Sequence, residues 1–149
     1  MATTGLPPDF KEFLKLLHSH GVEYLLVGGY AVGLHGHPRA TAGLDVWVGL
    51  GEENAGRLVE VLEKFGFNPP QLSPGLFLQP DRVVRMGVPP VRIEILTTIS
   101  GVDFPSCYAR RQTKTLDGVP VSLISLADLK ATKKAAGRHQ DLSDLEHLP

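Results

Sequence analysis

The stretch Val27-Gly-Gly-Tyr-Ala-Val-Gly-Leu-His-Gly-His-Pro-Arg-Ala-Thr-Ala-Gly-Leu-Asp-Val-Trp-Val48 carries the signals that decide the fold. It begins where a short apolar run, residues 23–27, predicts a mostly buried strand. Gly28-Gly29 comes next, followed by a short helical stretch over residues 30–35. Residues 44–48 predict a second strand. A strand, a glycine pair, a helix and another strand are typical of an α/β fold.

The second strand carries an acid in the middle of an apolar run. Its period of two divides the side chains between two faces, with Leu44, Val46 and Val48 on one and Gly43, Asp45 and Trp47 on the other. We expect the aliphatic face to be the core face. Asp45 then lies on the opposite face of the sheet.

The segments before and after this stretch have helical periodicity. Apolar residues at helical spacing after Pro8-Asp9 predict a helix that ends near Gly21. The spacing from Ala55 to Leu62 predicts an amphipathic helix that ends near Gly66. Residues 66–82 contain too many prolines for regular structure, so we expect an ordered loop or a flap over a site.

Two further strands are predicted over residues 82–87 and 91–97. In the second, Ile93 and Ile95 share one face, and Glu94 lies on the other. Glu94 can therefore share a surface with Asp45.

The rest of the sequence predicts a hairpin and short helices. Asp117-Gly118, between two short strand-like runs, is a strong hairpin-turn signal. A short helix is expected to begin at Asp103, and Ser125 is the expected N-cap of a lysine-rich helix that ends near Gly137. One or two helical turns are expected over residues 141–148.

Length, charge and cysteine content bound the class of protein. A chain of 149 residues can bury one ordinary core, so we expect a single domain over residues 1–149. No run approaches the roughly 18 apolar residues that span a bilayer, and no signal-peptide pattern is present, which predicts a soluble, cytoplasmic protein with no membrane partner. The formal charge of −1 provides no overall basic surface for nucleic acid. The single Cys107 has no partner for an internal disulfide.

Three separated groups are candidates for chemistry. Backbone N–H groups at Gly28-Gly29 suit phosphate oxygens, and Asp45 and Glu94 on neighbouring strands suit Mg²⁺. Each group also has an ordinary interpretation: a tight turn for the glycines, a local hydrogen bond for Asp45, and a surface pair with Arg92 for Glu94. Their joint order favours the functional interpretation.

In this order the residues resemble the DNA polymerase β-like nucleotidyltransferases, and particularly small bacterial members with a Gly-Gly, His-Gly, Pro-Arg-x-Thr series before an acidic strand. The resemblance continues through Val91 to Phe104, Asp128 to Arg138 and Asp141 to Leu145, and so covers nearly the whole chain. It implies a nucleotidyltransferase fold with a mixed, twisted β-sheet flanked by helices and a C-terminal hairpin.

The resemblance also implies a reaction. Asp45 and Glu94 would bind Mg²⁺, or Mn²⁺ in its place, and Glu94 would also be the general base. Two ions about 3.5–4 Å apart would stabilise in-line displacement at the α-phosphate of an NTP, with pyrophosphate leaving. The nucleotide-binding residues implied are Gly28, Gly29, Arg39, Thr41 and Lys133.

Gly43 departs from this pattern, because the family has an aspartate there as the first acid of an Asp-x-Asp pair. Loss of one such electrostatic group typically costs on the order of 10²–10³ or more in rate. Three explanations stay open: an inactive mutant, a naturally degenerate member, or a ligand supplied from elsewhere, such as His35, His37 or Asp103.

Other candidate residues have weaker support. Lys130, Lys133 and Lys134 give one helix a basic face, which fits a triphosphate or RNA contact and equally well a solvated surface. The pair His35-x-His37 lacks the further ligands of a zinc site. Trp47 fits base stacking or, more commonly, packing.

Three functions follow from these observations. The first is transfer of a nucleoside monophosphate from an NTP to a hydroxyl of RNA, a protein or a small molecule. The second is a catalytically inactive member of the same fold that binds a nucleotide or a partner protein, as in toxin–antitoxin or phage-defence pairs, or that forms a homodimer. The third is a structural interaction domain without nucleotide or metal.

Overall fold

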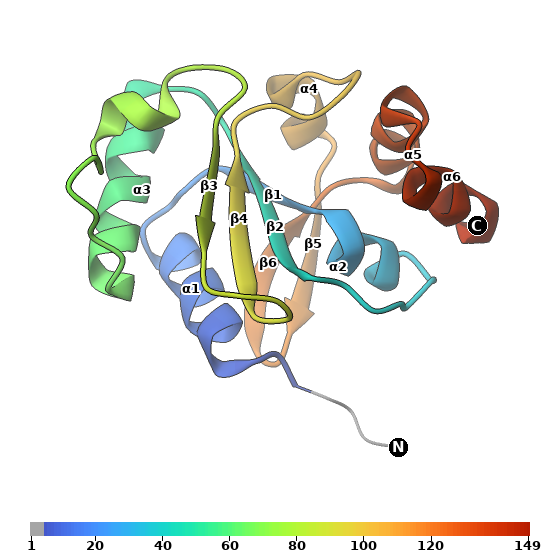
Figure 1. Ribbon diagram of the computed structural model, residues 1–149, viewed down its shortest axis with the longest axis horizontal. Coiled ribbons are helices and arrows are strands. Elements are labelled where there is room, and N and C mark those ends of the chain that lie inside the picture. Colours follow the sequence, from blue (N-terminus) through green and yellow to red (C-terminus); the bar gives the residue numbers. More distant parts are fainter. Residues whose placement is uncertain (1–4) are drawn as a thin grey trace.

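Six strands form the sheet that contains the glycine-rich stretch. The structure, a computed structural model, describes residues 5–149. The strands are β1 (Tyr24–Val27), β2 (Gly43–Val48), β3 (Val83–Met86), β4 (Arg92–Leu96), β5 (Gln112–Leu116) and β6 (Val119–Leu123). Their spatial order is β3-β4-β2-β1-β6-β5, so β2, which carries Asp45, lies inside the sheet (Figure 1).

The sheet is mixed. β2 pairs with β4 and β1 pairs with β6 in parallel, whereas the β1–β2, β3–β4 and β5–β6 pairs are antiparallel. Parallel neighbours require a long crossover connection, and the chain between β2 and β4 provides one. The predicted α/β class with a mixed sheet and a C-terminal hairpin is confirmed.

Helices cover both sides of the sheet. They are α1 (Pro8–Ser19), α2 (Gly28–Leu34), α3 (Glu52–Phe65), α4 (Phe104–Ala109), α5 (Leu126–Ala136) and α6 (His139–His147), with a 3₁₀ helix η1 at Pro74–Phe77. Figure 1 shows α1 and α3 on one side and α2, α4, α5 and α6 on the other. Among residues 5–149, no helix has the length and apolarity that crossing a bilayer requires.

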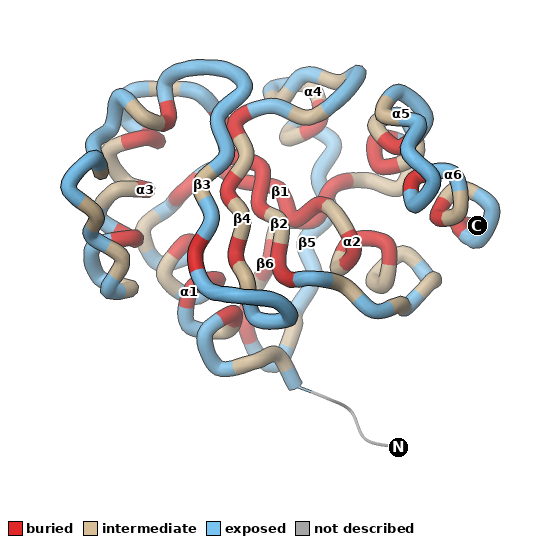
Figure 2. The backbone as a smooth tube through the Cα atoms, in the orientation of Figure 1, coloured by how far each residue is buried: buried red, intermediate tan, exposed pale blue. Residues whose placement is uncertain are grey.

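The core lies on both faces of the central strands (Figure 2). Leu44, Val46 and Val48 are fully buried, as the alternation predicts, but Trp47 on the opposite face is buried as well. Its indole Nε1 donates to the carbonyl of Thr97 at 3.3 Å, and its ring packs edge to face on Phe104 with centroids 5.1 Å apart. Trp47 is therefore a packing residue, and its contacts do not favour base stacking.

The structure corrects one prediction about a helix start and narrows one about a loop. α2 begins at Gly28 and not near Tyr30, because the glycine pair itself forms the first turn. Residues 66–82 contain η1, which packs against α3, and Phe77 within it is buried. Of the two expectations for this segment, the ordered loop is the one that this apolar anchor supports.

The turn and capping signals of the second half are confirmed. Asp117 and Gly118 both have positive φ, 51° and 80°, as a two-residue hairpin turn of type I′ requires. The side chain of Ser125 accepts from the amide of Asp128 at 3.1 Å and caps α5. Asp103 caps α4 in the same way.

Gly43 lies where β2 and β4 approach each other very closely. A Cβ added there would overlap the carbonyl oxygen of Arg92 and lie 2.7 Å from its carbonyl carbon. The obstacle is backbone of the neighbouring strand, which cannot rotate away. The packing of β2 against β4 therefore leaves no space for a side chain at position 43.

We expect Gly43→Ala to lower the free energy of unfolding by about 2 kcal/mol, because overpacking a buried contact typically costs about 1–3 kcal/mol. Gly56→Ala is the matched control, since nothing lies within 4 Å of a Cβ at Gly56 in α3. That control gains helix propensity and should be unchanged or more stable by up to about 1 kcal/mol. Urea unfolding measures both, and equal stability of the two variants would contradict the strand contact.

Candidate functional site

A cleft of about 400 Å³ lies between the end of the central strands and the two C-terminal helices. Side chains of β2 and β4 form one wall, and residues of α5 and the start of α6 form the other. The charged residues that line it are Asp45, Glu94, Lys133, Arg138 and Asp141. Gly28, at the junction of β1 and α2, also borders the cleft.

Asp45 and Glu94 are direct neighbours, as the sequence predicts. They occupy paired positions in the parallel β2–β4 register, so both carboxylates project from one face of the sheet. Gly28 approaches Asp45 closely, because a Cβ at Gly28 would lie 2.9 Å from Cγ of Asp45. The φ of +68° at Gly28 also favours glycine. The turn therefore leaves the Asp45 carboxylate without a covering side chain.

Asp45 is held in an unfavourable environment for its charge. Burial, followed by repulsion from Glu94, raises its pKa to about 6. Attraction from Arg92, Lys133 and Arg138 opposes this shift and only partly offsets it. None of these contributions is a hydrogen bond. Asp45 is thus a partly buried acceptor that is available to a ligand.

Glu94 is occupied by two arginines. Arg85 Nε donates to one carboxylate oxygen at 3.0 Å, and Arg92 Nη2 donates to the other at 2.9 Å. The pairing with Arg92 is the ordinary interpretation that the sequence offered for Glu94. The Arg92 Nε is buried and has no hydrogen-bond partner within the described part of the chain. The acidic wall of the cleft therefore includes positive charge.

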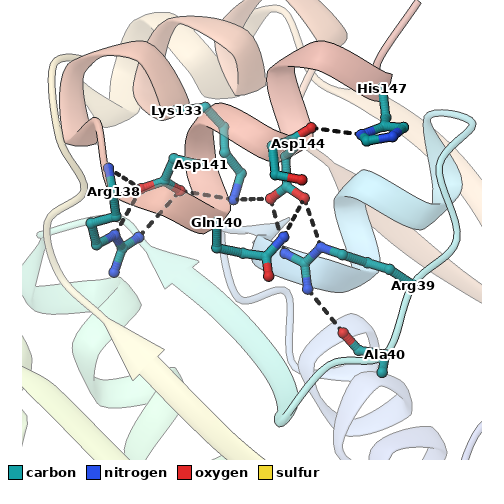
Figure 3. A network of polar contacts seen from close by, with 9 residues as sticks. Arg39, Ala40, Lys133, Arg138, Gln140, Asp141, Asp144 and His147 are labelled. Carbon is teal, nitrogen blue, oxygen red and sulfur yellow. Dashed lines mark hydrogen bonds and ion pairs between the residues drawn. The ribbon is translucent and has the colours of Figure 1, made fainter.

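Lys133 is buried in a network of charged side chains (Figure 3). Its Nζ lies 3.0 Å from an oxygen of Asp141 and 2.8 Å from an oxygen of Asp144. Arg138 Nε contacts the other oxygen of Asp141 at 2.7 Å. The helix thus does not present Lys133 on a solvated face, whereas Lys134 is exposed and Lys130 donates to the carbonyl of Pro149.

The other three residues expected at the nucleotide lie next to a second cavity. Gly29, Arg39 and Thr41 line a pocket of about 690 Å³ beyond the start of α2. A Cβ at Gly29 would lie 2.6 Å from Oγ1 of Thr41, so the glycine allows this loop to pack on α2. The structure therefore brings Gly28, Asp45, Glu94 and Lys133 together in one cleft, and Gly29, Arg39 and Thr41 in its neighbour.

The chain offers two neighbouring carboxylates for a metal ion. Mg²⁺ commonly binds one or two protein carboxylates and takes its remaining ligands from substrate phosphates and water, so Asp45 and Glu94 fit one such ion. Within residues 5–149 no cluster of three or more acidic, histidine or cysteine side chains is suited to a metal. The two carboxylates therefore fit a single ion.

The alternative ligands considered for the missing acid lie elsewhere. His35 Nε2 is 2.7 Å from the carbonyl oxygen of Ile124, and His37 stacks on His147 with ring centroids 4.3 Å apart. Asp103 caps α4 and borders a different pocket. None of the three lines the cleft.

Sequence reasoning missed the acids of α6. Asp141 is 2% exposed and Asp144 is fully buried, which is rare for carboxylates unless they are paired. The available signal was their spacing of three, which puts both on one face of a short helix directly after a lysine-rich one. Arg85 was also missed, because its contact with Glu94 depends on the β3–β4 register.

Comparisons with known proteins concern the fold. No protein-family model and no curated protein matches this chain. It is similar to the crystal structure of a protein from Thermotoga maritima named as a nucleotidyltransferase, with 15% identity and a TM-score of 0.62 over 92% of this chain and 88% of that chain. It is also similar to an antigenic nucleotidyltransferase-like protein from Paracoccidioides brasiliensis, with 20% identity and a TM-score of 0.53 over 97% and 77%.

At sequence identities of 15% and 20%, these similarities show a shared fold. Both matches extend over most of the two chains compared, and the mixed six-stranded sheet with helices on both sides agrees with them. The chain has the nucleotidyltransferase fold.

Proposed function

We propose that the cleft binds an NTP and transfers its nucleoside monophosphate to a hydroxyl of an acceptor, which is RNA, a protein or a small molecule. The observation that carries the proposal is the placement of Asp45 and Glu94 side by side, facing Lys133 and Arg138 across one cleft. Carboxylates suit a metal-bound triphosphate, and cationic side chains suit its oxygens. The fold supports the same class of reaction.

Each residue has a role that follows from its surroundings. Lys133 and Arg138 attract the phosphates. Gly28 has no side chain that would cover Asp45, so the phosphates can lie next to this carboxylate. Asp45 and Glu94 would hold Mg²⁺ or Mn²⁺, which supplies positive charge to the phosphates while pyrophosphate leaves. Within residues 5–149 no hydrogen bond to the Asp45 carboxylate is present, and burial raises the pKa of this group to about 6. Its oxygens are therefore open to a ligand, whereas both oxygens of Glu94 accept hydrogen bonds from arginines.

A second candidate is nucleotide binding without turnover, and the packing at Gly43 favours it. The position that holds the first acid in the family is closed by the backbone of Arg92. A protein of this kind would use the same cleft to sense a nucleotide, alone, as a homodimer or with a partner protein, as in toxin–antitoxin or phage-defence pairs. Binding with no product distinguishes it from the transferase.

The transferase proposal is tested by labelling. The purified chain is incubated with each α-labelled NTP, Mg²⁺ or Mn²⁺, and total RNA plus protein and small-molecule extracts. We expect a labelled acceptor, and a loss of at least 100-fold for Asp45→Asn, because the substitution removes a charge that would act on the transition state. Asp103→Asn, outside the cleft, is the control. Binding of NTP by the wild type with no product supports the second candidate, and full activity of Asp45→Asn rejects the site.

Gly43→Asp tests whether the first acid can be restored. We expect this variant to be less stable than the wild type by about 2 kcal/mol or more, because its Cβ meets the same strand backbone as alanine does. We also expect no gain in product formation. A stable Gly43→Asp variant with at least tenfold higher activity would show that the strands separate readily and that only the carboxylate was missing.

Asp45→Asn is expected to stabilise the fold at neutral pH. Because the folded pKa of Asp45 is raised to about 6 from 3.8, its ionisation destabilises the folded state as pH rises through about 6. Asparagine does not ionise, so the variant should be more stable by about 1–2 kcal/mol at pH 8, after allowance for partial solvent screening. The difference should shrink toward pH 4. Urea unfolding at both pH values measures it, and a pH-independent difference would contradict the buried charge.

A further inference from the structure

Lys133 has one hydrogen that its two carboxylate partners leave free. A lysine ammonium carries three hydrogens, and the contacts with Asp141 at 3.0 Å and Asp144 at 2.8 Å account for two of them. The side chain borders the cleft although only 8% of it is exposed. The two acids therefore fix the position of the nitrogen and determine the direction in which the third hydrogen points.

Asp144 connects this lysine to Arg39, which lines the neighbouring cavity. One of its oxygens accepts from Arg39 Nε at 2.7 Å, and the other accepts from Arg39 Nη2 at 2.9 Å and contacts Lys133. Figure 3 shows Asp144 between the two cations. Gln140 Nε2 donates to the same carboxylate at 3.0 Å. A single buried acid of α6 thus joins α5 to the loop that leads into β2.

The charge state of Asp144 is secured by its partners. Burial would raise its pKa, but hydrogen bonds from Arg39 and Lys133 outweigh burial and hold the pKa at about 2. Asp144 is therefore an anion throughout the physiological range. Burial would also raise the pKa of Asp141, but hydrogen bonds from Arg138 and Lys133 outweigh burial and lower this pKa.

Stability alone explains this network poorly. Replacing buried ion pairs with apolar residues of similar size is often neutral or stabilising, because desolvation offsets much of the attraction. The network has three cations and two acids, so it has a net positive charge, and two of the cations, Lys133 and Arg138, border the cleft. A fixed cation with a free donor at a cleft wall is an arrangement that suits an anionic ligand.

We propose that Asp141 and Asp144 are positioning residues that orient Lys133 so that its remaining hydrogen reaches a phosphate oxygen of the bound nucleotide. The inference rests on the proposed nucleotide cleft. It adds that α6, which carries none of the expected metal ligands, determines triphosphate affinity through Lys133. Arg39, on the same carboxylate, acts as a structural anchor for the loop and not as a direct phosphate ligand.

A double-mutant cycle tests whether Asp144 acts through Lys133. The dissociation constants of ATP with Mg²⁺ and of inorganic triphosphate are measured for the wild type, Lys133→Met, Asp144→Asn and the double variant, each well below its melting temperature. We expect each single substitution to weaken binding about tenfold. The double variant should bind no more weakly than Lys133→Met, because Asp144 has no lysine left to orient.

Asp128→Asn is the matched control for lost stability. Asp128 is a largely buried acid at the start of α5 that pairs with both donor groups of Arg110, at 3.0 and 2.9 Å, and it does not line the cleft. We expect it to lower the melting temperature comparably while changing both dissociation constants less than twofold. Asp144→Glu, which keeps the charge, should recover part of the affinity.

The outcomes separate the two proposals. Absence of ATP and triphosphate binding by the wild type would overturn the proposed function and this inference with it. Binding by the wild type, with additive losses in the double variant or with equal effects of Asp144→Asn and Asp128→Asn, would overturn the positioning role alone.

Discussion

The parallel pairing of β2 with β4 is the constraint on which the site depends. It places Asp45 beside Glu94 and, two residues earlier, Gly43 against the backbone of Arg92. The same register thus creates a pair of carboxylates and removes the space for a third. Because strand pairing fixes both, the acidic wall of the cleft cannot change without a change in the sheet.

The cleft contains both acidic and basic side chains, and Asp45 and Glu94 differ in the partners that surround them. Arginines from β3 and β4 bind both oxygens of Glu94, whereas Asp45 has only desolvation and more distant cations. The protein itself thereby fills hydrogen-bonding positions on Glu94, whereas burial raises the pKa of Asp45 to about 6. The difference arises because Arg85 of β3 and Arg92 of β4 both donate to Glu94.

Periodicity and turn chemistry predicted the local structure because they depend on neighbours in the sequence. The alternation around Asp45 and Glu94 placed both on one face, and Asp117-Gly118 specified the hairpin. The ion pair between Arg39 and Asp144 joins residues 105 apart, so no local pattern encodes it. For a related reason, proline content left both an ordered loop and a flap open over residues 66–82: it does not reveal that Phe77 is anchored in the core.

The position of α6 in chain order has a consequence for biosynthesis. All six strands precede it, and its acids complete the network around Lys133 and Arg39. During translation the whole sheet emerges from the ribosome before Asp141 and Asp144 do. The sheet can therefore form before Asp141 and Asp144 are available to complete the ion-pair network around Lys133 and Arg39.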